Sequence, residues 1–148
     1  MSLQERVQEE IKAAMRARDK ARVGTLRMLS SALRDAEIAA GGALSEADEL
    51  AVVQKLIKQR RDAAAQYRDG GREEQAAAEE AEAGVLEDLL PAALSDEEVA
   101  EAIEQAITEA GAEGPQDMGR VMGLLKDRLQ GRADMGQVSQ QVKARLAS

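Results

Sequence analysis

Most familiar catalytic constellations are excluded by the residue types that this sequence lacks. It contains no Cys and no His, so it has no thiolate nucleophile, no disulfide, no sulfur-based zinc site and no imidazole general base. No phosphate-binding loop, Gly-x-Ser-x-Gly elbow or dinucleotide-binding fingerprint occurs. The sequence therefore predicts no catalytic residue, no metal site and no cofactor.

Carboxylates are abundant, with 28 Asp and Glu residues, so close spacings arise by chance. The most regular set lies on one side of a predicted helix without a basic or His companion, and consists of Glu97, Glu98, Glu101 and Glu104. A pair that shares a proton or a metal would need such a companion or a buried position. We interpret the set as a solvated helix face.

A different pattern, glycines at helical spacing among basic residues, runs from Asp117 to Lys143. Gly119 and Gly123 are four residues apart and so share one face of a helix. Each costs the helix about 1 kcal/mol relative to Ala, which calls for a compensating reason. We expect the reason to be close packing of another helix on the bare backbone. The alternative is close approach of a nucleic-acid backbone or of another protein.

Residues 131–134 predict a turn between two helices. Gly131 suits the end of the first helix, and Asp134 suits the N-cap of the second, with Gln137 at the reciprocal capping position. Arg132 would then lie beside a helix N-terminus, where free N–H groups favour a phosphate. Either a phosphate or the Asp134 carboxylate can occupy that position.

Charge is unevenly distributed along the chain, although its formal total is -8. Residues 1–71 hold 13 basic and 11 acidic side chains, residues 72–113 hold 1 and 14, and residues 114–148 hold 6 and 3. The last segment is therefore basic, and its candidate RNA-binding residues are Arg120, Lys126, Arg128, Arg132 and Lys143, with Arg145 nearby. Because Tyr67 is the only aromatic residue, such a face could not stack bases and would read the phosphates, sugars and shape of a structured RNA.

A second group of basic residues is expected on the third helix. No single stripe holds all of its members, and two aspartates dilute their field. We interpret it as a solvated face made of Lys55, Lys58, Arg60, Arg61, Arg68 and Arg72.

The elements that position these residues are all predicted to be helices, because Ala, Leu, Val, Ile and Met supply the apolar content. The first helix ends before a polar break at residues 19–20, and its apolar stripe is Leu3, Val7, Ile11 and Met15. The second covers about residues 21–40 and stops at Gly41, as a left-handed cap requires. Its apolar stripe is Val23, Leu26, Leu29 and Leu33, with Arg22, Arg27 and Arg34 outside it. These two helices are expected to form an antiparallel hairpin.

The third helix is predicted from Ser45 to Asp69 and the fourth between residues 72 and 90. The fourth is rich in Ala and Glu, so we expect it to be largely solvated. A boundary follows at Pro91, because the residue before Pro is disfavoured in a helix. Ser95 with Glu98 then forms a capping box that begins the first of three short helices.

The predicted fold class is all-α, with an N-terminal domain of about four helices at residues 1–93 and a three-helix C-terminal domain at residues 94–148. No stretch approaches the roughly 20 apolar residues that a membrane span needs, and the N-terminus has no apolar signal region. We expect a cytoplasmic protein without a membrane or DNA partner.

Several stretches carry a family resemblance that spans essentially the whole chain. They are LRMLSSAL at Leu26–Leu33, KQRRDAAAQYRDGGR at Lys58–Arg72, VLEDLLPAALSDEE at Val85–Glu98, and DMGRVMG and GRADMG across Asp117–Gly136. With them the chain resembles the YqeY family, which is similar to the C-terminal tail domain of the B subunit of the tRNA-dependent glutamyl/aspartyl-tRNA amidotransferase. The resemblance implies two helical domains.

In the amidotransferase the tail helps to hold the tRNA, and a separate, larger region that this chain lacks performs the chemistry. The tail typically reads Gly-Lys-Ala-Asn-Pro, whereas this chain has Gly131, Arg132, Ala133, Asp134 and Met135. The basic residue and the cap remain, but Asp134 adds a negative charge where an RNA phosphate would approach.

The leading functional prediction is a non-catalytic accessory protein that binds tRNA or another structured RNA. The alternative is a protein-interaction module in which the Gly119 and Gly123 face receives a partner helix. An amidotransferase-related activity, a carbon–nitrogen ligase with glutamine as amide donor, comes third and rests on family similarity alone.

Overall fold

The computed structural model describes residues 1–148, and its regular structure is entirely helical. Seven α-helices and one short 3-10 turn, η1, follow one another without a strand, which confirms the all-α prediction. The chain divides into two compact units, Met1–Leu90 and Pro91–Ser148.

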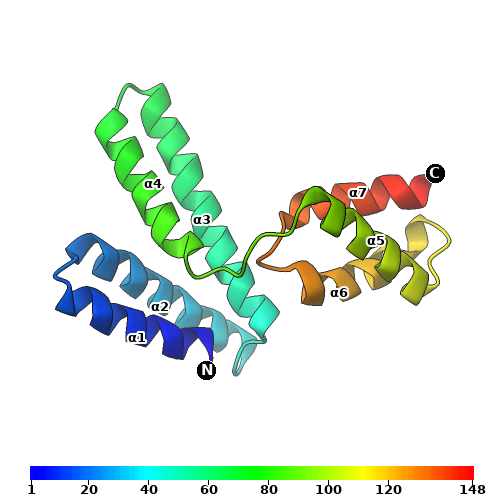
Figure 1. The fold of residues 1–148 in the computed structure, drawn as a ribbon, viewed down its shortest axis with the longest axis horizontal. Coiled ribbons are helices and arrows are strands. Elements are labelled where there is room, and N and C mark those ends of the chain that lie inside the picture. Colours follow the sequence, from blue (N-terminus) through cyan, green and yellow to red (C-terminus); the bar gives the residue numbers. More distant parts are fainter. The chain divides into compact units, whose positions relative to one another are not determined.

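The N-terminal unit consists of two helical hairpins (Figure 1). The first hairpin pairs α1 (Leu3–Arg16) with α2 (Lys20–Ala40), and the second pairs α3 (Glu46–Asp69) with α4 (Glu73–Glu87). Short polar turns connect the members of each pair, so the helices run antiparallel, as predicted for the first pair.

Local capping explains where these helices begin and end. Ser2 and Glu5 form a capping box at the start of α1, and Ser45 accepts the Asp48 N–H at the start of α3. Gly41 ends α2 with a φ of 77°, in the left-handed region that glycine adopts without strain. The predicted cap at Gly41 is confirmed.

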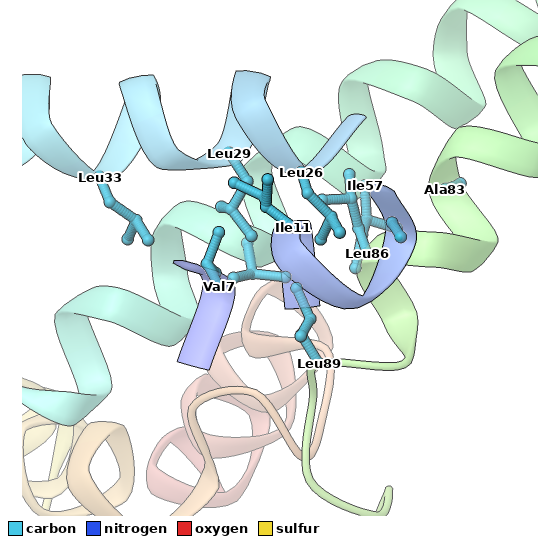
Figure 2. Packing of buried hydrophobic residues seen from close by; sticks show 11 residues of the cluster. Val7, Ile11, Leu26, Leu29, Leu33, Ile57, Ala83, Leu86 and Leu89 are labelled. Atoms are coloured by element: carbon cyan, nitrogen blue, oxygen red, sulfur yellow. The ribbon is translucent and has the colours of Figure 1, made fainter. Parts of the chain in front are cut away.

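A single apolar core holds the two hairpins together. Figure 2 shows leucine, isoleucine and valine side chains from all four helices of the unit meeting in one cluster, whose buried members include Val7, Ile11, Leu26, Leu29, Leu33, Val53, Ile57, Leu86 and Leu89.

Met15 does not belong to this core, contrary to the prediction. Its side chain is 54% exposed, whereas Ala14 is buried. A four-residue spacing advances about 40° around a helix at each step, so a stripe that starts at Leu3 drifts off the buried face by its fourth member. Ala14, three residues after Ile11, lies back on that face.

The prediction that the fourth helix is largely solvated holds for one side of it, with eight of its 15 residues exposed, and overlooks a buried side. Ala76, Ala83 and Leu86 of α4 are buried against the neighbouring helices. Two of the three are alanines, which let the backbones of α3 and α4 approach closely.

Ion pairs reinforce this contact and correct the interpretation of the basic residues on α3. Arg60 pairs with Glu79 at 3.6 Å and with Glu82 at 3.4 Å, and Arg68 pairs with Glu73 at 2.9 Å and Glu80 at 2.7 Å. Arg61 also pairs with Glu87. The three arginines therefore bind α4, although Arg61 and Arg68 are also exposed. The members of this group without a carboxylate partner are Lys55, Lys58 and Arg72.

The C-terminal unit folds three helices around a core of its own. They are α5 (Asp96–Ala110), α6 (Met118–Leu129) and α7 (Met135–Ala147), with η1 (Pro115–Asp117) before α6. The predicted capping box of Ser95 and Glu98 is present. The largest buried residues of the core are Ile103, Ile107, Val121, Leu125, Leu129, Val138, Val142 and Leu146.

Candidate nucleic-acid interface

Gly119 and Gly123 lie on the exposed side of α6. The buried side of the helix consists of Val121, Leu125 and Leu129, and the glycines point away from it. A Cβ atom built on either glycine would meet no atom within 4 Å. The prediction that another helix of this chain packs on them is therefore wrong, and the fold offers no internal reason for two glycines inside α6.

Gly131 has a complete local explanation. It is buried and adopts a φ of 84°, a left-handed conformation that other residues adopt only at a cost. The N–H groups of Arg132 and Ala133 then donate to the Leu129 carbonyl at 2.8 and 3.1 Å. Gly131 thus shapes the turn between α6 and α7.

The N-terminus of α7 is occupied by a carboxylate of the protein. Asp134 Oδ1 accepts the N–H groups of Gly136 at 2.9 Å and Gln137 at 3.3 Å. The predicted N-cap is confirmed, but the predicted reciprocal bond from the Gln137 side chain is absent. Of the two ligands considered for this helix end, the Asp134 carboxylate is the one that occupies it.

Arg132 is half-buried and holds the start of the unit in place. Its Nε donates to the Ala92 carbonyl at 3.1 Å, and its own carbonyl accepts the Leu94 N–H at 2.9 Å. These bonds join the segment before α5 to the turn between α6 and α7. The guanidinium therefore has a positioning role within the fold.

Three other basic side chains of the unit are paired with carboxylates. Arg120 binds Asp117, Arg128 binds Glu109, and Arg145 Nε lies 2.7 Å from Glu104 Oε1. The Arg145 pair corrects the expectation that Glu104 has no basic companion. The pKa of Asp117 lies below its ordinary value, because the Glu113 N–H and then the Arg120 guanidinium bind its carboxylate.

The last two candidates are Lys126 and Lys143, and both side chains are exposed whatever contacts they make. Lys126 follows Gly123 by three residues and therefore lies on the glycine side of α6. Over the whole unit, ten acidic residues outnumber six basic ones, a formal charge of -4. Asp127 follows Gly123 by four residues and lies on the same side. The candidate surface is thus a bare strip with one lysine and one aspartate in an acidic unit, and we call Gly119, Gly123 and Lys126 the glycine side of α6.

The N-terminal unit contains a cavity of about 430 Å³ between α3 and α4. Its lining residues are Arg61, Ala65, Arg68, Glu80, Ala83, Gly84 and Glu87. The two arginines are already bound to glutamates across the cavity, so no charge is free to hold a ligand there. No group of three or more acidic side chains is placed to hold a metal ion, and none of the helices is both long and apolar enough to cross a membrane.

The sequence prediction placed Arg27 and Arg34 outside the apolar stripe of the second helix but did not join them with Lys20 into a candidate surface. Lys20, Arg27 and Arg34 are exposed on α2 and form no ion pair. Their regular spacing of seven residues could have indicated this group, because residues that are seven apart lie on the same side of a helix.

These observations define a small all-helical protein of two compact units. A sequence model described as Yqey-like protein matches residues 4–146, and the chain belongs to the YqeY family, as the resemblance predicted. It is also similar to "Altered inheritance of mitochondria protein 41, mitochondrial" of the fungus Pyrenophora tritici-repentis (strain Pt-1C-BFP), with 28% identity over 142 residues. That alignment covers 93% of this chain and 77% of the fungal protein.

Proposed function

We propose that this protein is a non-catalytic accessory protein that binds structured RNA, with tRNA as the leading candidate, through the glycine side of α6. The observation that carries the proposal is the exposure of Gly119 and Gly123, beside which a Cβ would meet nothing in the chain. Two glycines that weaken a helix without serving its packing are explained by a ligand that approaches the helix backbone closely.

A sugar–phosphate backbone suits this surface. The glycines leave peptide groups accessible for close contact with riboses, and Lys126 supplies a charge on the same side. Arg120 is adjacent, but it pairs with Asp117, whose side chain is only 14% exposed against 63% for the arginine, so an RNA phosphate that took Arg120 from this carboxylate would leave it unpaired at a cost. Without aromatic side chains in this unit, recognition would rest on RNA shape and phosphates.

The family supports the proposal through its similarity to the tail domain of the amidotransferase B subunit. Asp134 places a carboxylate at the N-terminus of α7, so we place the RNA contact on α6 and not at that helix end. Because few cations are involved, binding should be modest and should weaken as salt rises. We propose the cytoplasm as the location, on the sequence expectation alone.

The rival proposal is a protein-interaction module, and the same two glycines favour it. A bare strip on a helix accepts a partner helix at short distance, and the acidic charge of the unit suits a basic protein. Binding that survives nuclease treatment and is lost on substitution of the glycines would favour this rival.

Replacing Gly119 and Gly123 with Ala tests the proposal by moving stability and affinity in opposite directions. The added methyl groups meet open space, so we expect the free energy of unfolding to rise by about 1 kcal/mol per site. The same methyl groups would obstruct RNA, so affinity for total tRNA at low salt should fall several-fold. Urea denaturation and fluorescence anisotropy measure the two effects.

The matched control is Gly84→Ala in α4. Gly84 is also an exposed glycine inside a helix, and a Cβ atom added there would meet nothing within 4 Å. The substitution should therefore give a similar gain in stability without a change in RNA affinity. Unchanged affinity in the α6 double variant, or no saturable tRNA binding by the wild type, would reject the proposal.

A further inference from the structure

The exposed side of α2 combines three cations with two small residues. Lys20, Arg27 and Arg34 recur every seven residues, and Gly24 and Ser31 lie between them with the same spacing. Seven residues make nearly two helical turns, so all five side chains share one side, which we call the α2 basic side. All five residues are exposed. Successive cations are about 10 Å apart along the helix axis.

The cations of the α2 basic side are free of acidic partners, unlike the neighbouring arginine on the same helix. Arg22 pairs with Glu10 at 3.4 Å and with Asp88 at 3.7 Å. Arg27 instead has only the Met15 sulfur, at 3.9 Å from its guanidinium nitrogen. Asp35 is the one acidic residue that adjoins this side, and Asp19 at its start is engaged in capping α2.

This lack of partners is notable because the N-terminal unit is acidic. It holds 18 acidic and 14 basic residues, enough carboxylates to pair every cation. The arginines at 60, 61 and 68 of α3 are all paired across to α4. Nine cations of the unit have no carboxylate partner, and five of them lie on the α2 basic side and at the turn before it.

The turn before α2 supplies a second, independent observation. Arg18 has a φ of 58° and is the only residue other than glycine with a positive φ. Its N–H donates to the Met15 carbonyl at 3.1 Å and the Asp19 N–H donates to the Ala14 carbonyl at 3.0 Å, a helix-ending arrangement in which glycine is preferred. An L-residue there costs about 1–2 kcal/mol, so a long cation is kept at a strained position next to Lys20.

From this geometry we propose that the α2 basic side, extended by Arg16 and Arg18 at the turn, binds the phosphate backbone of a structured RNA. It would be a second RNA contact, on the N-terminal unit, and it deepens the function proposed above. The three spaced cations match a row of phosphates, while Gly24 and Ser31 let the sugar edge come close, with the serine hydroxyl available to bond it. No acid–base chemistry is involved.

An anionic membrane is a poorer match for this side. Membrane-surface helices insert a broad apolar face. On this side the exposed large apolar residues are Ile38, in line with the cations at 79% exposure, and Met15, beside Arg27 at 54% exposure. The opposite, apolar side of α2 is buried in the core through Leu26, Leu29 and Leu33. Ile38 and Met15 cannot replace that face, so the charges favour a nucleic-acid backbone.

The test is a triple substitution in the full chain, Lys20→Gln with Arg27→Gln and Arg34→Gln. The wild type and the variant are titrated with labelled total tRNA between 50 and 200 mM salt, and circular dichroism checks the fold. We expect affinity at low salt to fall at least about tenfold and the slope of log K against log salt to decrease by about 2, because each lost phosphate contact removes about 0.7–0.9 from it.

The matched control removes the same charge elsewhere in the unit, through Lys55→Gln with Lys58→Gln and Arg72→Gln. These side chains are exposed and form no ion pair, so an effect of net charge alone would appear equally in both variants and would overturn the inference. A slope that changes only in the α2 variant supports it.

Failure of this inference is separable from failure of the proposed function. If the α6 glycine variant loses tRNA affinity and the α2 variant does not, the α2 contact is wrong and the α6 proposal stands. The reverse result supports the α2 contact and rejects the α6 one. If the wild type does not bind tRNA, both fail, and α2-dependent binding to phosphatidylglycerol vesicles would assign the surface to a membrane.

Discussion

Glu49 is the one buried carboxylate of the N-terminal unit. Its residue is 8% exposed, and its Oε2 accepts the Leu3 N–H at 3.1 Å. The first turn of α3 thus caps the first turn of α1, next to the capping box of Ser2. Burial raises the pKa of Glu49 above its ordinary value of 4.5, and the N–H groups of Leu3 and Gln4 oppose this shift only in part.

Glu49→Gln should therefore change how stability depends on pH. Since the folded-state pKa is raised, the stability that protonated Glu49 contributes is fully present below about pH 4.5 and is lost as pH rises through the folded pKa. Glutamine keeps an oxygen acceptor for Leu3 and carries no charge. We expect the stability of the variant relative to the wild type to increase as the pH rises from 4 to 7.

Urea denaturation of the wild type and of Glu49→Gln at pH 4 and at pH 7 measures this difference in stability. Glu49→Ala is the control, because it removes the acceptor as well and should destabilise by about 1–3 kcal/mol. An equal loss of stability in the glutamine variant at pH 4 and pH 7 would contradict the role of desolvation.

At the scale of elements, the ion pairs of α4 show that the distance between two charged groups is a poor guide to how much their pair stabilises the protein. The Arg68 pairs are shorter than the Arg60 pairs, at 2.7–2.9 Å against 3.4–3.6 Å. However, the Arg60 and Glu79 side chains are only 25% and 20% exposed, whereas Arg68 is 43% and Glu73 is 69% exposed. Burial makes a lost partner costly, and exposure makes it cheap.

Arg60→Ala should consequently destabilise the N-terminal unit more than Arg68→Ala. The first substitution leaves the half-buried Glu79 carboxylate unpaired and should cost about 1–3 kcal/mol. The second removes solvent-screened pairs worth about 0–1 kcal/mol. Thermal unfolding followed by circular dichroism compares the two, and the opposite order would refute the argument from burial.

The sequence predicted the helices and several of their ends, because caps such as Ser95 with Glu98 and Gly41 act within a few residues. It did not predict the docking of α4. The buried face of this helix consists of Ala76, Ala83 and Leu86, which a count of large apolar residues overlooks. The arginines that bind it lie on another helix, and pairing between helices leaves no periodic signal in either one.

At the scale of the whole molecule, folding changes the charge of the candidate surface. Residues 114–148 alone are basic, but the C-terminal unit also contains the acidic helix α5. Glu104 pairs with Arg145 and Glu109 pairs with Arg128. The sequence identified the glycines and cations as candidates, but it could not say which of these cations pair with carboxylates of α5 after folding.

The same limit explains the wrong expectation about Gly119 and Gly123. Their spacing establishes a shared face, and only the position of the other helices decides whether that face is covered. Because no other helix covers this face, we propose that structured RNA contacts α6 there.

Backbone amide NMR of the isotopically labelled full chain, titrated with tRNA, observes this contact at the two glycines themselves. We expect the amides of Gly119 and Gly123 to shift or broaden saturably at low salt, while those of Gly84 in α4 and Gly111 at the end of α5 remain unchanged. Saturable tRNA binding that leaves the Gly119 and Gly123 amides unperturbed would contradict an RNA contact on α6.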